Sequence, residues 1–206
     1  MNGNHVITLE DLIKATEQFS QLEKRGSYYD MAIHLDSVGF ELEAATILLS
    51  TWNTNRFKFS VGDGPAELKK ALDACREGFK SLEGQTFEEI NFRRITPVIH
   101  SIYNRLSLVD GVKYTGASKL MHLKSPRLFV MWDQYIRDRY NFEAAADDYT
   151  HFLIRMQEKF LGLGWNDPTK PLTKAIDEYN YVTISIPAVQ REKEKRKESS
   201  KRYAPK

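Results

Sequence analysis

Cysteine is nearly absent from this chain: among 206 residues there is one, Cys75. A single cysteine excludes an intramolecular disulfide, a four-cysteine zinc site and an iron–sulfur cluster held by this chain alone. No apolar run approaches the ~20 residues that cross a bilayer, and residues 1–6 lack the basic and apolar parts of a signal peptide. These absences predict an intracellular protein, in the cytoplasm, nucleoid or nucleus, with no membrane partner.

An excess of one charge is also missing, since the formal net charge is +2. Affinity for nucleic acid would therefore have to come from a local basic patch. We find no spacing of His, Cys and carboxylates typical of a metal site and no glycine-rich loop for nucleotide phosphates, so we expect no metal and no cofactor. Nothing in the sequence demands a partner chain, and we expect a monomer.

Strand signals are scarce as well, and apolar residues recur mostly at helical spacing. We therefore predict an all-α fold, with helices over residues 9–25, 28–35, 40–52, 66–82, 95–106, 115–123, 134–140, 143–161 and 173–179. Residues 40–52 are almost uniformly apolar after Leu42, which is typical of a buried central helix. Residues 181–186 alternate and predict a short strand or an extended segment.

The last part of the chain differs in composition from the rest. Residues 190–206 are highly charged and have almost no apolar face, which predicts a solvated helix or a disordered tail. Residues 1–189 would then form one helical domain. At this length it is either a single unit or two lobes that share a core.

The most informative stretch joins a glycine turn to a carboxylate. Residues 109–117 read V-D-G-V-K-Y-T-G-A, and residues 127–133 read R-L-F-V-M-W-D. Gly111 permits the positive φ of a tight turn, and the helix after it offers unpaired backbone N–H groups that can bind a phosphate. Asp133 follows the hydrophobic run and suits the N-cap of the next helix.

These residues resemble the helix-hairpin-helix DNA glycosylases of the endonuclease III and MutY type. In that family the hairpin reads Leu-Pro-Gly-Val-Gly-x-x-Thr-Ala, and a catalytic Asp follows a run such as Phe-Pro-Ile-Leu-Asp. The spacing from Ala117 to Asp133 matches the family without a gap. The resemblance covers roughly residues 38–140, is sharpest over 108–136, and places the hairpin at about 95–123.

The resemblance implies a two-lobed, all-α enzyme that removes a damaged or mismatched base from double-stranded DNA, with Asp133 as its catalytic carboxylate. The chain departs from the family pattern in several places. Asp110 replaces the hairpin Pro, Lys113 replaces the second Gly, and Thr115 stands where bifunctional members have a nucleophilic Lys. The four-cysteine cluster of many members is absent. The acidic residue of the adenine-specific branch falls near Thr46.

Lys119 is a candidate substitute for the missing nucleophile, because it follows Thr115 by four residues and lies on the same helix face. Desolvation would lower its pKa and make the amine reactive toward the sugar C1′, which would add AP-lyase activity. Alternatively, Lys119 neutralises Asp133 or contacts phosphate. Asp133 in turn is read either as a catalytic acid or as a plain N-cap, and the two roles are compatible.

The DNA contacts that this interpretation predicts come from the hairpin and its surroundings. They are Gly111, Val112, Lys113, Thr115, Lys124 and Arg127, with Trp52 as the residue that fills the gap left by an extruded base. Each has an ordinary alternative, as a turn, core or solvated residue. Two other functions remain open for the chain: a non-catalytic helix-hairpin-helix module that only binds DNA, and a helical protein-interaction domain that recruits a partner through its basic tail.

Overall fold

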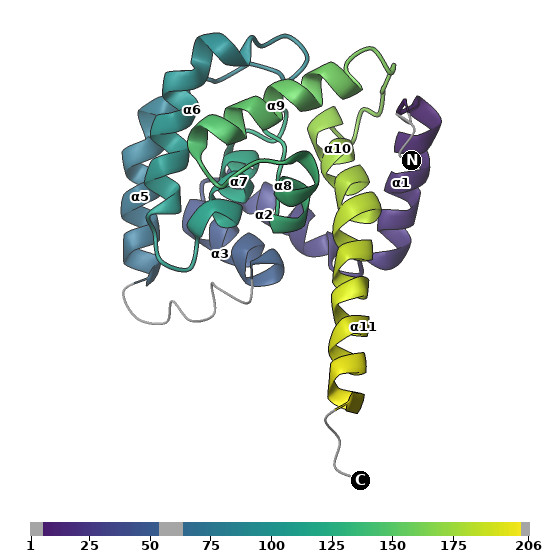
Figure 1. Ribbon diagram of the computed structural model, residues 1–206. Helices are drawn as coiled ribbons and strands as arrows, with labels where there is room; N and C mark the ends of the chain where they lie inside the picture. The colour runs from purple at the N-terminus through teal and green to yellow at the C-terminus, as the bar shows by residue number, and fades with distance from the viewer. Residues whose placement is uncertain (1–5, 54–63, 203–206) are drawn as a thin grey trace.

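The first helix begins at residue 9, as predicted, and a capping box closes its start. In α1 (Leu9–Leu22), the Thr8 hydroxyl accepts a hydrogen bond from the Asp11 N–H at 3.2 Å, and the Asp11 carboxylate accepts one from the Thr8 N–H at 2.9 Å. The computed structural model describes residues 6–53 and 64–202. Over these ranges the secondary structure is helical and no strand occurs, which confirms the predicted all-α class (Figure 1).

The remaining helices follow the predicted order with small shifts at their ends. They are α2 (Gly26–Ser37), α3 (Glu41–Trp52), α5 (Gly64–Lys80), α6 (Phe92–Ser107), α7 (Lys113–Lys124), α8 (Gln134–Tyr140), α9 (Ala146–Phe160), α10 (Leu172–Asn180), the π-helix η1 (Tyr181–Ser185) and α11 (Ile186–Arg202). None of the helices in the described ranges is both long and apolar enough to cross a membrane.

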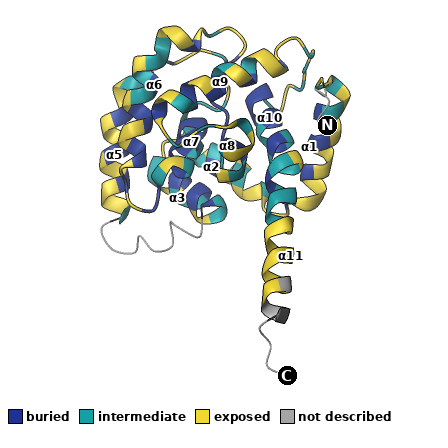
Figure 2. Ribbon diagram, viewed as in Figure 1, coloured by how far each residue is buried: buried dark blue, intermediate teal, exposed yellow. Residues whose placement is uncertain are grey.

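The C-terminal part differs most from the sequence-based expectation. Residues 181–186 are not a strand or an extended segment, because α10 continues through the π-helix η1 into α11. Tyr181 of η1 packs edge-on against Phe19 of α1, with ring centroids 5.6 Å apart, so packing against α1 overrides the alternating pattern. Helix α11 is the solvated helix of the two alternatives for the tail. It projects from the body (Figure 1), and its residues 190–197 are exposed (Figure 2).

Helix α7 is largely enclosed near the centre of the fold. Seven of its twelve residues are buried, including the small residues Gly116, Ala117 and Ser118. A Cβ added at Gly116 would lie 2.9 Å from Val112 Cγ1 and 3.2 Å from Leu49 Cδ2. Gly116 therefore allows α7 to approach α3, the helix that the sequence alone marks as central. One continuous hydrophobic core extends from Leu12 of α1 to Ile176 of α10.

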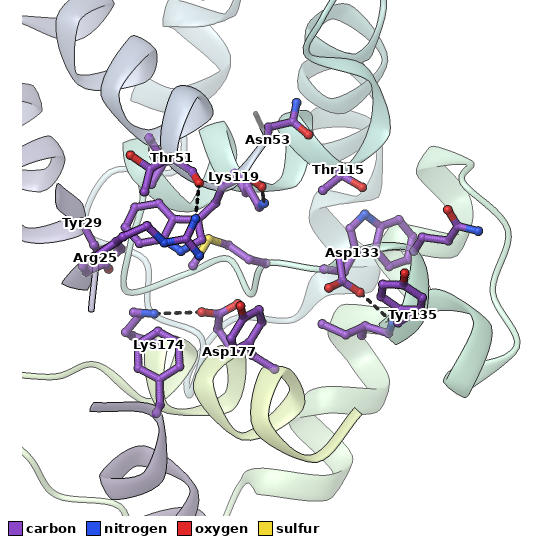
Figure 3. Close-up of a pocket in the computed structure, with 18 of the residues that line it drawn as sticks. Arg25, Tyr29, Thr51, Asn53, Thr115, Lys119, Asp133, Tyr135, Lys174 and Asp177 are labelled. Atoms are coloured by element: carbon purple, nitrogen blue, oxygen red, sulfur yellow. Dashed lines mark hydrogen bonds and ion pairs between the residues drawn. The ribbon is translucent and has the colours of Figure 1, made fainter. Parts of the chain in front are cut away.

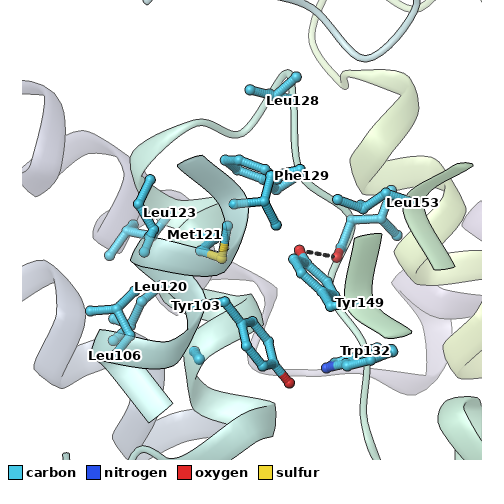
Figure 4. Packing of buried hydrophobic residues seen from close by; sticks show 14 of the residues in the cluster. Tyr103, Leu106, Leu120, Met121, Leu123, Leu128, Phe129, Trp132, Tyr149 and Leu153 are labelled. Atoms are coloured by element: carbon cyan, nitrogen blue, oxygen red, sulfur yellow. Dashed lines mark hydrogen bonds between the residues drawn. The ribbon is translucent and has the colours of Figure 1, made fainter. Parts of the chain in front are cut away.

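Aromatic side chains fill the core beside α7 (Figure 4). Trp132 and Tyr149 have ring centroids 5.0 Å apart, Tyr103 stacks on Tyr149 at 5.0 Å, and Phe152 lies 5.2 Å from Trp132. Contacts of this kind add about 0.5–1.5 kcal/mol each beyond the buried area. The cluster holds the segment that leads from α7 to α8, and with it the position of Asp133.

Candidate functional site

A tight turn joins α6 to α7, and its backbone conformation fits the glycine seen in the sequence. Gly111 has φ +77°, and Lys113 has φ +51°, in the left-handed region that a non-glycine residue rarely adopts. The Asn53 side-chain amide donates to the carbonyls of Gly111 at 2.8 Å and Val112 at 3.1 Å. The end of α3 therefore fixes the turn, a contact that the sequence did not reveal.

The segment before Asp133 crosses the core in an extended conformation, and side chains satisfy its backbone. The Ser118 hydroxyl donates to the Trp132 carbonyl at 3.2 Å, the Tyr149 hydroxyl donates to Val130 at 2.9 Å, and His122 Nδ1 lies 2.6 Å from the Phe129 carbonyl. Buried peptide groups need such partners. These bonds from α7 and α9 hold the segment rigidly and fix where its last residue lies.

Asp133 is the N-cap of α8, as predicted. One carboxylate oxygen, Oδ1, accepts from the Ile136 N–H at 2.9 Å. The capping bond orients the carboxylate while the same side chain lines a cavity of about 500 Å³. The structural and the functional reading of Asp133 are thus geometrically compatible.

This cavity is bounded by α1, α2, α3, α7, α8, α10, η1 and α11. Its walls combine aromatic rings with charged side chains. Figure 3 shows Lys119 from α7, Asp133 from the start of α8, and Lys174 with Asp177 from α10 around the same space. Its volume lies within the 300–1,000 Å³ typical of small-molecule sites. The cavity is the best candidate for a functional site in the described part of the chain.

Lys119 is mostly buried at the wall of the cavity and has no carboxylate in contact. Its Nζ donates to the main-chain carbonyl of Trp52, the last residue of α3. Desolvation by burial lowers the pKa of Lys119 to about 8, opposed chiefly by the charge of Asp133. No ion pair joins these two described side chains, so each remains available to a bound molecule.

Lys174 lines the same cavity but has acidic neighbours. Its Nζ lies 2.9 Å from Asp177 Oδ2 and 3.5 Å from Glu178 Oε1, and it packs over the rings of Phe19 at 4.5 Å and Tyr29 at 4.7 Å. Desolvation opposes the charge on Lys174, yet the two carboxylates outweigh it and raise its pKa. Lys174 therefore stays a cation.

His122 is a structural residue. Burial lowers its pKa to about 4, so the ring is neutral. With Nδ1 donating to the Phe129 carbonyl, Nε2 accepts from the Tyr29 hydroxyl at a distance of 2.7 Å. The hydrogen-bonded structural role, rather than that of a catalytic base, fits this geometry.

The residues predicted to contact DNA are not gathered in one place. Thr115 and Trp52 line the cavity, and Thr115 accepts a hydrogen bond from Arg137 Nη1 at 3.2 Å. Lys113 is partly exposed at the turn and pairs with Asp110 at 3.2 Å. Val112 is fully buried. Its N–H donates to the Val109 carbonyl within the turn. Because its side chain is buried, Val112 presents no side-chain surface to DNA.

Lys124 and Arg127 lie at the other end of α7. Eleven residues at 1.5 Å per residue place Lys124 about 16 Å from Lys113 along the helix. Lys124 Nζ is also held by Asp36 at 2.9 Å and Glu41 at 3.2 Å. This corrects the expectation of one basic group around the hairpin: Lys124 is part of a mostly buried ion-pair network, and Arg127 is exposed beyond it.

Several cavity residues were not anticipated from the sequence. Arg25, Tyr29, Lys174, Asp177 and Tyr181 all line the cavity, and all lie outside the stretch that carries the family resemblance. A charged residue at the position of Lys174, on the apolar side of an amphipathic helix, was the one available signal. Its spacing to Asp177 and Glu178 suits ion pairs along a helix.

The described residues include no group of three or more His, Cys, Asp or Glu side chains arranged to hold a metal ion. The chain matches no known family model, and neither the curated proteins nor the solved structures contain a significant match to it.

Proposed function

We propose that this chain is a DNA base-excision glycosylase, in which Asp133 and Lys119 act on the N-glycosidic bond of an extruded nucleotide. The observation that carries the proposal is that one cavity of about 500 Å³ is lined by both side chains. Enzymes that modify a base in DNA take the nucleotide out of the stack into such a pocket. An amine with its pKa near neutrality beside a fixed carboxylate is the chemistry that cleavage at C1′ requires.

The reaction follows from these two groups. The neutral amine of Lys119 attacks C1′, the bond from C1′ to the base nitrogen breaks, and its electron pair leaves with the base, which takes up a proton from solvent. The new C1′–N bond leaves the Lys119 nitrogen with an extra proton, which passes to the Asp133 carboxylate. The nitrogen lone pair then forms a protonated imine with C1′ while the C1′–O4′ bond breaks, and Asp133 returns its proton to O4′. Before attack, the carboxylate stabilises the positive charge that develops on the sugar.

The burial of Lys119 has a direct kinetic meaning. With a pKa of about 8, about a tenth of the amine is neutral at pH 7, against less than a thousandth for an ordinary lysine. The neutral fraction rises about tenfold per pH unit below pH 7, reaches about half at pH 8 and then levels off. The proposed reaction should follow the same profile.

The surroundings of the cavity support DNA as the partner. Thr115 lies at the cavity wall two residues after the partly exposed Lys113 of the turn, so a backbone held at the turn would pass close to the cavity. Helix α11 starts at the cavity rim, where Val189 lines it, and presents exposed Arg191, Lys193 and Lys195 beyond. Such cations bind phosphates and release counterions.

The proposal is tested with a panel of labelled duplexes, each carrying one damaged or mismatched base, with and without borohydride. We expect alkali-labile sites with wild-type protein, at least a hundredfold loss of cleavage in Asp133→Asn, and a borohydride-trapped adduct that is absent in Lys119→Gln. Lys70→Gln removes an exposed lysine of α5 and is the matched control. Retained cleavage in Asp133→Asn would overturn the assignment.

Three results would redirect the interpretation. Cleavage with no trapped adduct would show that water, rather than Lys119, attacks the sugar. Salt-dependent binding with no cleavage of any duplex would favour a binding module, in which Asp133 acts only as the cap of α8. Absence of any affinity for DNA would favour a protein-interaction domain.

A further inference from the structure

The excess positive charge of this chain lies at its C-terminal end. Residues 190–206 hold eight of the 30 Lys and Arg residues and three of the 28 Asp and Glu residues. Residues 1–189 therefore hold the other 22 cations against 25 carboxylates. Because the body has no surplus of cations, long-range attraction of a polyanion depends on the C-terminal segment.

Helix α11, which carries these cations, is fixed at its base. The π-helix η1 before it packs against α1, where the rings of Tyr181 and Phe19 lie 5.6 Å apart. Val189, in the first turn of α11, lines the candidate cavity. One turn later, the Tyr135 hydroxyl of α8 donates to Glu192 Oε2 at 3.0 Å. The helix then projects from the body (Figure 1), so its side chains are presented at a set angle to the cavity.

The cations of α11 lie on two different faces. An α-helix turns by about 100° per residue. Lys193 and Lys197 follow Val189 by four and eight residues, and so lie about 40° and 80° from it around the axis. Arg191 and Lys195 follow it by two and six residues and lie about 160° and 120° away. Lys193 and Lys197 thus form a row that begins at the cavity rim, whereas the other pair faces away from it.

The described part of this row is solvent-exposed and positively charged. Residues 190–197 are all exposed (Figure 2) and carry five cations against two carboxylates. One of the carboxylates, Glu192, accepts from Tyr135 and lies 3.9 Å from Arg196. Lys193 and Lys197 form no ion pair with another described residue, so both can meet an anionic ligand.

The composition of the row indicates which ligand it suits. Residues 190–197 contain no apolar side chain. A lipid surface or an apolar groove on a protein binds the apolar face of a helix, and neither would find one here. The two lysines of the row are about 6 Å apart along the helix. Phosphates two nucleotides apart on one DNA strand are about 7 Å apart along the duplex, which is a close match.

We propose that α11 binds the phosphates of one DNA strand through Lys193 and Lys197, the row that continues outward from the cavity rim. The strand held in this way would be the one that places its nucleotide in the cavity, because Val189 at the start of the row lines that cavity. This inference rests on the proposed binding of DNA by the chain and does not depend on cleavage.

Two double variants of the full chain test the row. Lys193→Gln with Lys197→Gln removes it, and Arg191→Gln with Lys195→Gln removes the same charge from the other face of the same exposed helix. Gln is a good helix former, and circular dichroism checks that both variants keep the helical content of the wild type. The probe is a labelled duplex with a tetrahydrofuran abasic analogue, which has no base to release. Fluorescence anisotropy measures its affinity over a range of salt concentrations.

We expect loss of the row to lower the slope of log K against log salt by about two and the affinity at low salt by about tenfold or more. The Arg191 and Lys195 variant should lose less than about threefold in affinity, since its cations act only at a distance. Equal losses in the two variants would show a general effect of charge, and unchanged affinity in both would show no contact. Either result would overturn the inference, as would binding of polyglutamate as tightly as the duplex.

Cleavage of base-containing duplexes, measured in parallel, separates this inference from the proposed function. A selective loss of affinity on removal of the row, with no cleavage by the wild type, supports the contact and overturns the glycosylase proposal. Intact cleavage with equal affinity in the two variants overturns the contact and leaves the glycosylase proposal standing. Absence of any wild-type affinity for DNA overturns both.

Discussion

Lys119 and Lys174 line the same cavity, and their surroundings shift their pKa values in opposite directions. Burial lowers the pKa of Lys119 to about 8, whereas Asp177 and Glu178 outweigh burial and raise the pKa of Lys174. The difference lies in what each Nζ touches, which is a main-chain carbonyl for Lys119 and two carboxylates for Lys174. Only the first arrangement leaves a nucleophile.

The comparison also separates two electrostatic environments within one cavity. A lysine without a contacting carboxylate is the nucleophile of the proposed reaction, and a lysine with two of them is a fixed positive charge that holds Asp177 in place. The two sit on different helices, α7 and α10. Each lysine can therefore be substituted while the helix that carries the other stays in place. The following predictions compare such single substitutions.

The largest expected effect is on stability when Lys174 is replaced. Lys174→Met leaves Asp177 without its cation and leaves Glu178, which is nearly inaccessible to solvent, paired with Lys170 alone. Removing one partner of a buried ion pair typically costs about 3–5 kcal/mol. Lys119→Met removes a desolvated amine that has no carboxylate partner, and its free energy of unfolding should stay within about 1 kcal/mol of the wild type. Urea denaturation at pH 7 measures both.

Equal destabilisation by the two replacements would contradict the distinction between the lysines. Glu178→Gln is a third variant for this comparison, since Asp177 still holds Lys174 in it. Its loss in free energy of unfolding should lie between those of Lys174→Met and Lys119→Met. Lys170, which also pairs with Glu178 at 2.6 Å, should contribute little to the difference because its side chain is partly exposed.

The sequence predicts the features that depend on near neighbours. The start of the first helix at residue 9, the turn at Gly111 and the N-cap role of Asp133 each depend on residues within a few positions, where local rules apply. Helix periodicity likewise predicts most of the elements. The continuation of α10 into α11 was missed, because contacts of Tyr181 with Phe19 join segments that are far apart in the chain.

The candidate site is less predictable than the fold. Lys119 and Asp133 lie fourteen residues apart in a recognisable motif, so both could be identified. Arg25, Lys174 and Asp177 come from segments before and after that motif, and only tertiary packing brings them to the cavity. Val112 is predicted to contact DNA because of its place in the turn, whereas the folded chain buries it completely.

A smaller effect is expected in the pH dependence of stability. The protonated form of Lys119 is disfavoured in the folded state, so the unfolded chain holds more protons between pH 8 and 10.5, and stability rises with pH across that window. Lys119→Met should lose this rise, on the order of 2–3 kcal/mol relative to the wild type. Urea denaturation of both proteins at pH 7, 9 and 10.5 gives the difference.

Asp133→Asn tests how strongly the neighbouring carboxylate affects the pKa of Lys119. The charge of Asp133 is the largest influence that opposes the desolvation of Lys119, so its removal should lower the pKa of Lys119 further, by less than about one unit. NMR titration of the labelled amine measures the change. The variant would then hold a more neutral amine and still fail to cleave. A rise in the pKa would contradict the proposed proximity of the two groups.

The smallest effect concerns a third lysine, at the turn, where the backbone rather than the charge is under strain. Lys113 has φ +51°, a conformation that costs a non-glycine residue about 1–2 kcal/mol, and the resembled motif has glycine there. Lys113→Gly relieves this strain but gives the unfolded chain more freedom, so a gain of at most about 1 kcal/mol is expected in urea denaturation. If Lys113 also contacts a phosphate, the slope of log K against log salt for DNA binding should fall by about one. Lys113→Ala keeps the backbone strain and removes the charge. It should therefore change the salt slope of DNA binding without raising the free energy of unfolding. If its gain in stability equalled that of Lys113→Gly, the ion pair with Asp110, and not the backbone, would be the unfavourable element.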